Sequence, residues 1–80
     1  MQAKTNLANL KKGDKAKIIG MSALGEIRRR LLDMGVCKGV QLKVVRVAPL
    51  GDPIEIHLKG FNLSLRIEEA EKIEVLKIEP

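Results

Sequence analysis

Cys37 is the only cysteine of this 80-residue chain, so no disulfide within the chain can hold its fold together. A domain this small buries only about 60% of the surface that its unfolded chain exposes, and many such domains need a disulfide or a metal. Structural zinc usually takes four Cys or His ligands, and His57 is the only histidine. Stability must therefore come from an aliphatic core, which a hydrophobic content of 45% supplies. We expect one domain over residues 1–80.

The charge balance is basic, with 15 Lys and Arg against 10 Asp and Glu and a net charge of +5. A basic protein can bind nucleic acid or an anionic membrane, so both are candidate partners. The charges are scattered, however, and no stretch is long and apolar enough to suggest membrane insertion. The first residues also lack the apolar core of a signal peptide. Together with the single cysteine, these features predict a cytoplasmic protein.

Short runs of alternating apolar and polar residues predict β-strands separated by Gly and Pro turns. The predicted strands span residues 15–20, 41–48, 54–59, 63–67 and 73–78. Residues 6–14 are predicted to be an entry segment anchored by Leu7 and Leu10. The alternation slips at Val44-Val45, which indicates a β-bulge. Residues 49–53 (PLGDP) form a strong turn signal, and residues 68–71 are predicted to make one helical turn.

Residues 24–34 carry the one clear helical pattern. Four apolar residues recur at i, i+3, i+7 and i+10 and so share one helix face: Leu24, Ile27, Leu31 and Met34. Gly35 is predicted to end the helix in the left-handed conformation, with Val36 packing back over the last turn.

Five short strands with one helix inserted after the first predict a mainly β fold. We expect a small antiparallel barrel of the SH3-like or OB-like kind, with the helix covering one open end. The predicted core brings together five apolar residues: Ile27, Leu31, Ile56, Leu65 and Ile73.

The sequence offers no set of residues for catalysis, which needs a nucleophile with a base, paired carboxylates or a metal. His57 alternates with core residues in its strand and should point to solvent. Cys37 follows Val36 and is expected to be a buried, inert thiol. We therefore predict no catalytic residue, no cofactor and no metal site, and hence no enzyme.

Nucleic-acid binding is also not predicted. The run Arg28-Arg29-Arg30 could contact phosphate, but it equally fits a solvated helix face. Proteins that bind single-stranded nucleic acid stack its bases on aromatic side chains, whereas this chain has Phe61 and no Tyr or Trp.

Three apolar residues fall outside the core pattern and suggest a docking surface. Met21 and Leu24 flank the helix start, and Leu50 lies in the Pro-Gly turn, where residues are usually polar. The alternative for Leu50 is that it folds back to cap the barrel. We expect a partner-binding surface of these three residues with Arg28 and Arg29 at its rim, which would favour an acidic partner.

Several short motifs resemble the signatures of the FeoA family of bacterial ferrous iron transport. Residues 30–36 (RLLDMGV) are similar to its RRLLDMG signature, and residues 48–53 (APLGDP) and 63–66 (LSLR) to two others. Glu69-Ala70 is a weaker fourth match, and the motifs run in order from about Leu7 to Val75. The resemblance implies an SH3-like barrel that serves as a cytoplasmic accessory protein of the FeoB membrane transporter, whose cytoplasmic part is a GTPase.

Two other functions stay open. SH3-like domains of this type also occur at the C-terminus of iron-dependent transcriptional repressors, although the winged helix that precedes them there is absent from these residues. A metal-binding chaperone that uses Cys37, His57 and carboxylates is the third hypothesis, against which the shortage of soft ligands argues. Weak homo-oligomerisation also stays open.

Overall fold

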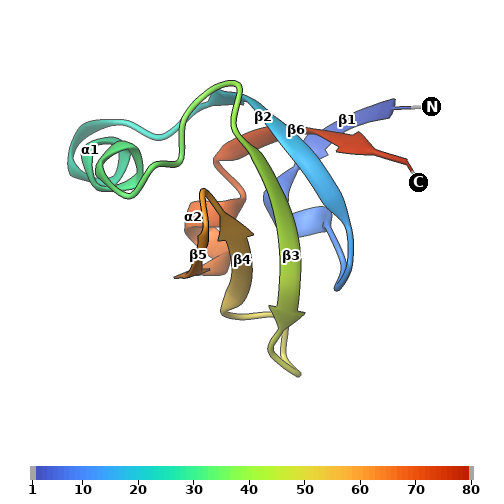
Figure 1. Ribbon diagram of the computed structural model, residues 1–80. Coiled ribbons are helices and arrows are strands. Elements are labelled where there is room, and N and C mark those ends of the chain that lie inside the picture. The colour runs from blue at the N-terminus through green and yellow to red at the C-terminus, as the bar shows by residue number, and fades with distance from the viewer. Residues whose placement is uncertain (1, 80) are drawn as a thin grey trace.

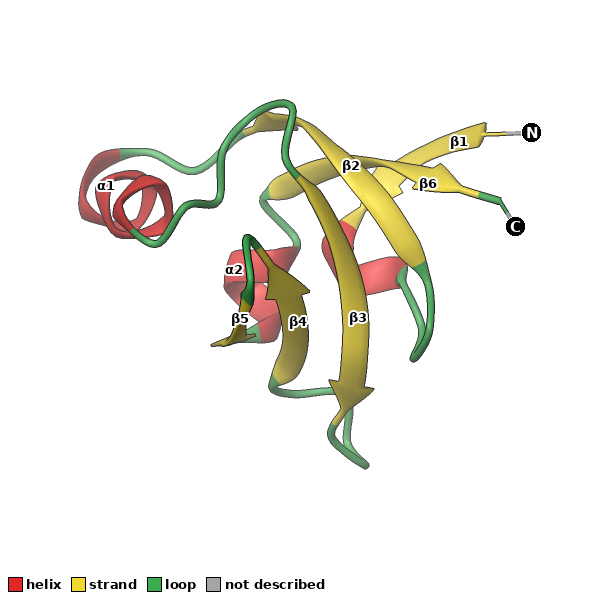
Figure 2. Ribbon diagram, viewed as in Figure 1, coloured by secondary structure: helices red, strands yellow, loops and turns green. Residues whose placement is uncertain are grey.

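The computed structural model describes residues 2–79 of the chain (Figure 1). Strands and short helices follow one another in this order: β1 (Gln2–Asn6), the 3₁₀ turn η1 (Leu7–Asn9), β2 (Lys15–Met21), α1 (Gly25–Asp33), β3 (Gln41–Val47), β4 (Ile54–Leu58), β5 (Phe61–Leu65), α2 (Ile67–Ala70) and β6 (Ile73–Ile78). Figure 2 shows one strongly curved sheet, with α1 set apart at one end and α2 and η1 in contact with each other.

All strand pairs are antiparallel, in the order β1-β6-β2-β3-β4-β5. The mainly β prediction is confirmed, but two details of the expected barrel are wrong. The sheet has six strands instead of five and does not close, so β1 and β5 form its edges. The missed strand, β1, pairs along its whole length with β6 from Gln2↔Ile78 to Asn6↔Glu74. The sequence of β1, QAKTN, has no alternation of apolar and polar residues that could reveal a strand. The strand is held by its backbone pairing with β6 more than by a buried face.

The core is aliphatic, as predicted. Leu31, Ile56, Leu65 and Ile73 are all buried within it. The placement of Ile27 in this core is wrong, since 36% of its surface is exposed. The reason is the position of α1, which touches the rest of the molecule mainly through its C-terminal half. All nine residues of α1 are described, and Leu31 is the one that is buried.

The end of α1 has the predicted geometry. Gly35 has a φ of +90°, the left-handed region that glycine enters without strain. The N–H of Gly35 donates to the carbonyl of Leu32 at 3.0 Å, and the N–H of Val36 donates to the carbonyl of Leu31 at 2.9 Å. These two bonds form a Schellman motif, and the contact of buried Val36 with the last turn completes it.

The predicted bulge in β3 is confirmed by a register shift between Val44 and Arg46. The predicted start of the fourth strand at residue 63 is wrong, because β5 begins at Phe61 and ends at Leu65. Lys59 and Gly60, with φ values of 49° and 86°, make a two-residue hairpin between β4 and β5. A turn with two left-handed residues fits the twist of the strands, and it brings Phe61 into the ladder opposite Leu58. Ile67, expected in the strand, instead opens α2.

Leu31 should anchor α1 to the sheet. We expect Leu31→Ala to lower the free energy of unfolding in urea by about 2–5 kcal/mol, because the change leaves a cavity in the core. The matched control is Leu24→Ala in the exposed residue that precedes the helix, which should change stability by less than about 0.5 kcal/mol. An equally small effect of Leu31→Ala would show that the helix does not pack on the sheet.

Candidate functional site

The five residues predicted to bind a partner lie on the surface or close to it. Leu24 is 81% exposed at the start of α1, and Leu50 is 96% exposed at the tip of the turn between β3 and β4. The alternative in which Leu50 folds back onto the core is therefore wrong. Arg28 and Arg29 are exposed, whereas Met21 is partly buried against the core.

These residues do not form one continuous surface. Figure 1 places α1 at the upper left of the view and the tip of the turn between β3 and β4 at its bottom, far apart from each other. The periodicity of the sequence could not reveal this separation, which depends on how the strands between the two segments curve. Leu24 and Leu50 therefore belong to two separate exposed sites.

The site at Leu24 continues along α1. Leu32, which the sequence analysis did not select, is 42% exposed. Leu24, Arg28 and Leu32 are spaced at i, i+4 and i+8, so they follow one another along the same flank of the helix. We call this row the α1 flank. The α1 flank combines apolar side chains with a positive charge. In the sequence, its signal is the spacing of these three residues at intervals of four.

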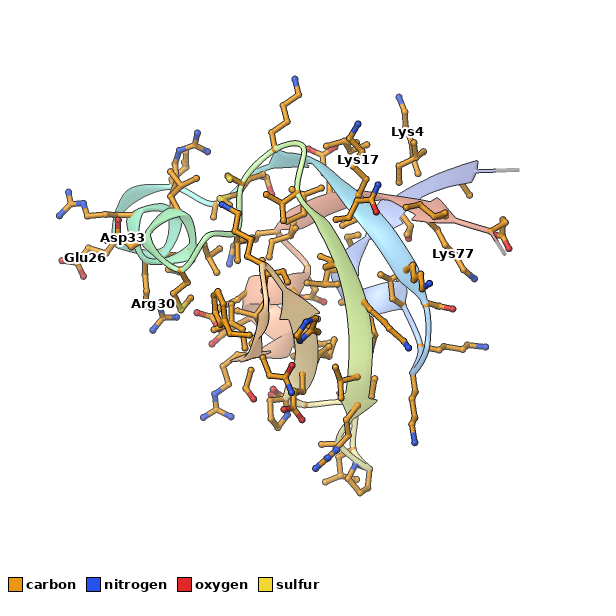
Figure 3. All side chains as sticks on the ribbon, in the orientation of Figure 1. Lys4, Lys17, Glu26, Arg30, Asp33 and Lys77 are labelled. Atoms are coloured by element: carbon orange, nitrogen blue, oxygen red, sulfur yellow. The ribbon has the colours of Figure 1, made fainter. Side chains whose placement is uncertain are left out.

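An ion pair joins α1 to α2. The guanidinium of Arg30 meets the carboxylate oxygen Oε2 of Glu69, whose side chain is buried. Figure 3 shows Arg30 extending from the side of α1 nearer to α2 and β5. The other oxygen, Oε1, accepts a hydrogen bond of 2.9 Å from the backbone N–H of Arg66 just before α2. One carboxylate therefore satisfies the start of α2 and holds α1 at the same time.

The turn between β3 and β4 contacts the start of α2 through Asp52. Asp52 Oδ1 accepts a hydrogen bond of 3.1 Å from the backbone N–H of Ile67, the first residue of α2. Its Oδ2 lies 4.0 Å from Nη1 of Arg66. Asp52 and Glu69 thus each accept one backbone N–H at the beginning of α2, where a helix leaves its donors free.

A shallow pocket of about 370 Å³ opens between α1, β5 and α2. Its lining includes Met34, Pro53 and Leu65 as apolar parts and Ser64 and Arg66 as polar parts. Arg30 and Glu69 complete the lining, and the buried carboxylate is already neutralised by Arg30. The lining itself thus carries one positive charge in excess, that of Arg66, which Asp52 partly balances from 4.0 Å away.

His57 points to solvent, as predicted, on the outer face of β4. Its Nδ1 donates to Oδ1 of Asn62 at 2.6 Å, and Nδ2 of Asn62 donates to Oε2 of Glu55 at 3.3 Å. Cys37, which was expected to be buried, is only partly buried. Val36 takes the inward position after the helix, so the next residue turns outward.

Within residues 2–79, no three His, Cys, Asp or Glu side chains lie close enough together to hold a metal ion. None of the helices described there has the length and apolar character needed to cross a membrane.

A strongly curved antiparallel sheet with one main helix is the architecture of a small SH3-like domain. The model of the FeoA domain family matches residues 5–77, and the chain belongs to this family.

Two curated relatives are similar over 69 residues, or 86% of this chain. A Fe(2+) transport protein A/Fe(2+) transporter FeoB fusion protein of Porphyromonas gingivalis is 44% identical, and this chain spans 8% of its length. A Fe(2+) transport protein A of Campylobacter jejuni is 36% identical, with 93% of its length covered.

Solved structures confirm the SH3-like fold. FeoA of Chlorobium tepidum has a TM-score of 0.86 and 45% identity, with 94% of this chain and 71% of that chain covered. A zinc complex of FeoA from Stenotrophomonas maltophilia, an SH3 domain protein, has a TM-score of 0.78 and 28% identity, with 89% and 88% covered. A manganese-dependent transcriptional repressor, at 17% identity and a TM-score of 0.86, shares the fold.

The pair of neighbouring glutamates in α2 offers a test of the Arg30 contact. We expect Glu69→Gln to lower the free energy of unfolding by about 1–3 kcal/mol, because the change removes a buried charge that Arg30 and the N–H of Arg66 both use. Glu68→Gln, one residue away and exposed, is the matched control and should change it by less than about 0.5 kcal/mol. Equal effects of the two changes would show that the ion pair does not fix α1.

The isolated protein should not bind Fe²⁺ tightly. Fe²⁺ prefers several histidine or carboxylate ligands in fixed geometry, and the one histidine faces solvent beside an amide. Anaerobic calorimetry should detect no stoichiometric binding in the sub-micromolar range, with His57→Ala as a control that changes nothing. A stoichiometric, sub-micromolar site that His57→Ala removes would contradict this prediction.

Proposed function

We propose that this protein is an accessory protein of bacterial ferrous iron transport that binds the cytoplasmic GTPase part of a FeoB-type transporter. The observation that carries the proposal is the relative in which a FeoA segment and FeoB are fused in one chain. Fusion keeps two domains at high effective concentration, which is useful only if they act together. The same proposal places the protein in the cytoplasm, on the side of the membrane where the GTPase lies.

The surface of the molecule supports a binding role. Leu24 and Leu32 on the α1 flank and Leu50 on the turn are large apolar side chains left in water. Protein interfaces are centred on such residues and enriched in arginine, and Arg28 lies within the flank. A positive rim would raise the rate of association with an acidic partner and make binding sensitive to salt.

The regulatory role seen in iron-dependent repressors has less support. The likeness to a manganese-dependent repressor concerns the fold, at 17% identity. The fused relative, at 44% identity, instead connects the domain with a transporter.

The test measures binding to the purified GTPase domain of a FeoB-type transporter. We expect Leu24→Ala and Leu50→Ala each to weaken binding by about fivefold or more, because each leucine is the most exposed apolar residue of its own site and truncating such a contact typically costs more than about 1 kcal/mol. Binding of the wild-type protein should also weaken as salt is raised. Both variants should keep the stability of the wild-type protein.

The control is Lys17→Ala on β2, an exposed residue that Figure 3 shows away from α1. This change should leave affinity nearly unchanged. Wild-type affinity of both leucine variants would place the interface elsewhere, and absence of binding by the wild-type protein would overturn the proposed function.

A further inference from the structure

The free edge of β5 has a defined set of unpaired backbone groups. Within residues 2–79, β5 pairs with β4 alone and ends the sheet. In the two-residue hairpin at Lys59-Gly60, the carbonyl of Leu58 faces the N–H of Phe61. Because hydrogen-bonding direction alternates along an antiparallel strand, Phe61, Leu63 and Leu65 bond toward β4. The N–H and C=O groups of Asn62 and Ser64 therefore point outward, and both residues are exposed.

This edge lacks the usual protection against pairing with another chain. Proteins commonly guard edge strands with charged residues, proline or bulges. The sequence of β5, FNLSL, has no charge and no proline, and its register with β4 is continuous. The opposite edge strand, β1, carries Lys4. Phe61, the only aromatic residue of the chain, stands 42% exposed at the start of β5. Exposed aromatic residues are enriched in interfaces, so the unguarded edge also has an anchor.

The space beside the edge can accept side chains. The pocket of about 370 Å³ includes Ser64 and Leu65 of β5 on one side and Met34 beyond the end of α1 on the other. The end of α1 lies next to the β4–β5 turn, since a Cβ on Gly35 would be 3.4 Å from Cδ of Lys59. An added strand would thus have β5 as its neighbour and the end of α1 as one wall of its groove.

The charges around this groove leave an excess of cations, because Arg30 and Arg66 are balanced by Glu69 and Asp52 while Lys59 adds a further positive charge. This excess favours acidic residues in a bound segment. Lys59 stands at one end of β5 and Arg66 at the other, and the Arg66 side chain is 69% exposed. Arg30 lines the pocket and is 60% exposed. The one acidic residue in the lining, Glu69, is buried and paired with Arg30.

We propose that the edge of β5 binds an extended, acidic segment of the partner by adding it to the sheet as a further strand. The inference rests on the proposed function, because it names the element through which the transporter's cytoplasmic part would be held. A second copy of this chain is a poorer occupant, since it carries a charge of +5 and the same cations. A proline-rich helix is also poorly matched, since SH3 domains hold such ligands in aromatic-lined grooves and this chain has no Tyr or Trp.

The experiment is amide hydrogen exchange by NMR on the wild-type protein, free and bound to the purified GTPase domain of a FeoB-type transporter. In the free protein, the amides of Asn62 and Ser64 should exchange fast, while those of Phe61, Leu63 and Leu65 are protected by β4. In the complex, exchange at Asn62 and Ser64 should slow by about tenfold or more, because their N–H groups become hydrogen-bonded. Protection at alternate residues is the signature of an added strand.

Ser64→Pro removes one outward N–H without touching the bonds to β4, and it should lower affinity by about tenfold, whereas Ser64→Ala keeps the N–H and should bind as the wild type does. Arg66→Gln should weaken binding and reduce its salt dependence, with Lys4→Gln on β1 as the matched control (Figure 3). A spectrum of each free variant confirms its fold. If Ser64→Pro does not fold, the exchange pattern of the wild-type protein decides.

The outcomes separate the two proposals. Absence of any complex would overturn the proposed function and the inference with it. A complex in which Asn62 and Ser64 keep fast exchange would overturn the inference alone. Protection of these two amides that grows with the concentration of the free protein would make a second copy the occupant, and it would overturn the acidic partner segment.

Discussion

The carboxylate of Glu69 connects three parts of the chain that are distant in sequence. Its Oε1 accepts the N–H of Arg66 and so starts α2, while its Oε2 holds Arg30 of α1. A nine-residue helix is too short to be stable by itself in water, and α1 buries only Leu31 in the core. The ion pair and the Schellman motif at Gly35 therefore fix a helix that packing alone would hold weakly. The α1 flank and one wall of the pocket beside β5 depend on that position.

The FeoA signatures acquire a structural meaning from these contacts. Arg30 belongs to the first signature, Asp52 to the second, and Arg66 and Glu69 to the third and fourth. All four meet at the start of α2, where Asp52 and Glu69 satisfy backbone N–H groups and Arg30 and Arg66 balance the carboxylates. Resemblance at these positions thus predicts the fold well. The exposed residues proposed to bind a partner, such as Leu24 and Phe61, lie outside these four contacts.

The sequence predicts those features whose cause is local. The alternation of β4, the bulge in β3 and the glycine end of α1 follow from neighbouring residues, and all three are confirmed. The strand β1 could not be predicted, because it is held by the backbone of β6 some seventy residues away. Helical periodicity placed Ile27 and Leu31 on one face, but it cannot show which half of that face another element covers. The separation of Leu24 from Leu50 likewise depends on the curvature of the whole sheet.

An edge strand gives affinity through backbone bonds, which every extended peptide can form, so selectivity must come from the side chains around it. Around β5 these are Phe61 at one end and Arg30 and Arg66 at the other. Both arginines already have partners, Glu69 for Arg30 and Asp52 for Arg66, yet each remains more than half exposed. Contacts of this kind restrict the rotamers of a long side chain before a ligand arrives, so less conformational entropy is lost on binding. The contacts that hold α2 in the fold would therefore also orient the cations that select an acidic strand.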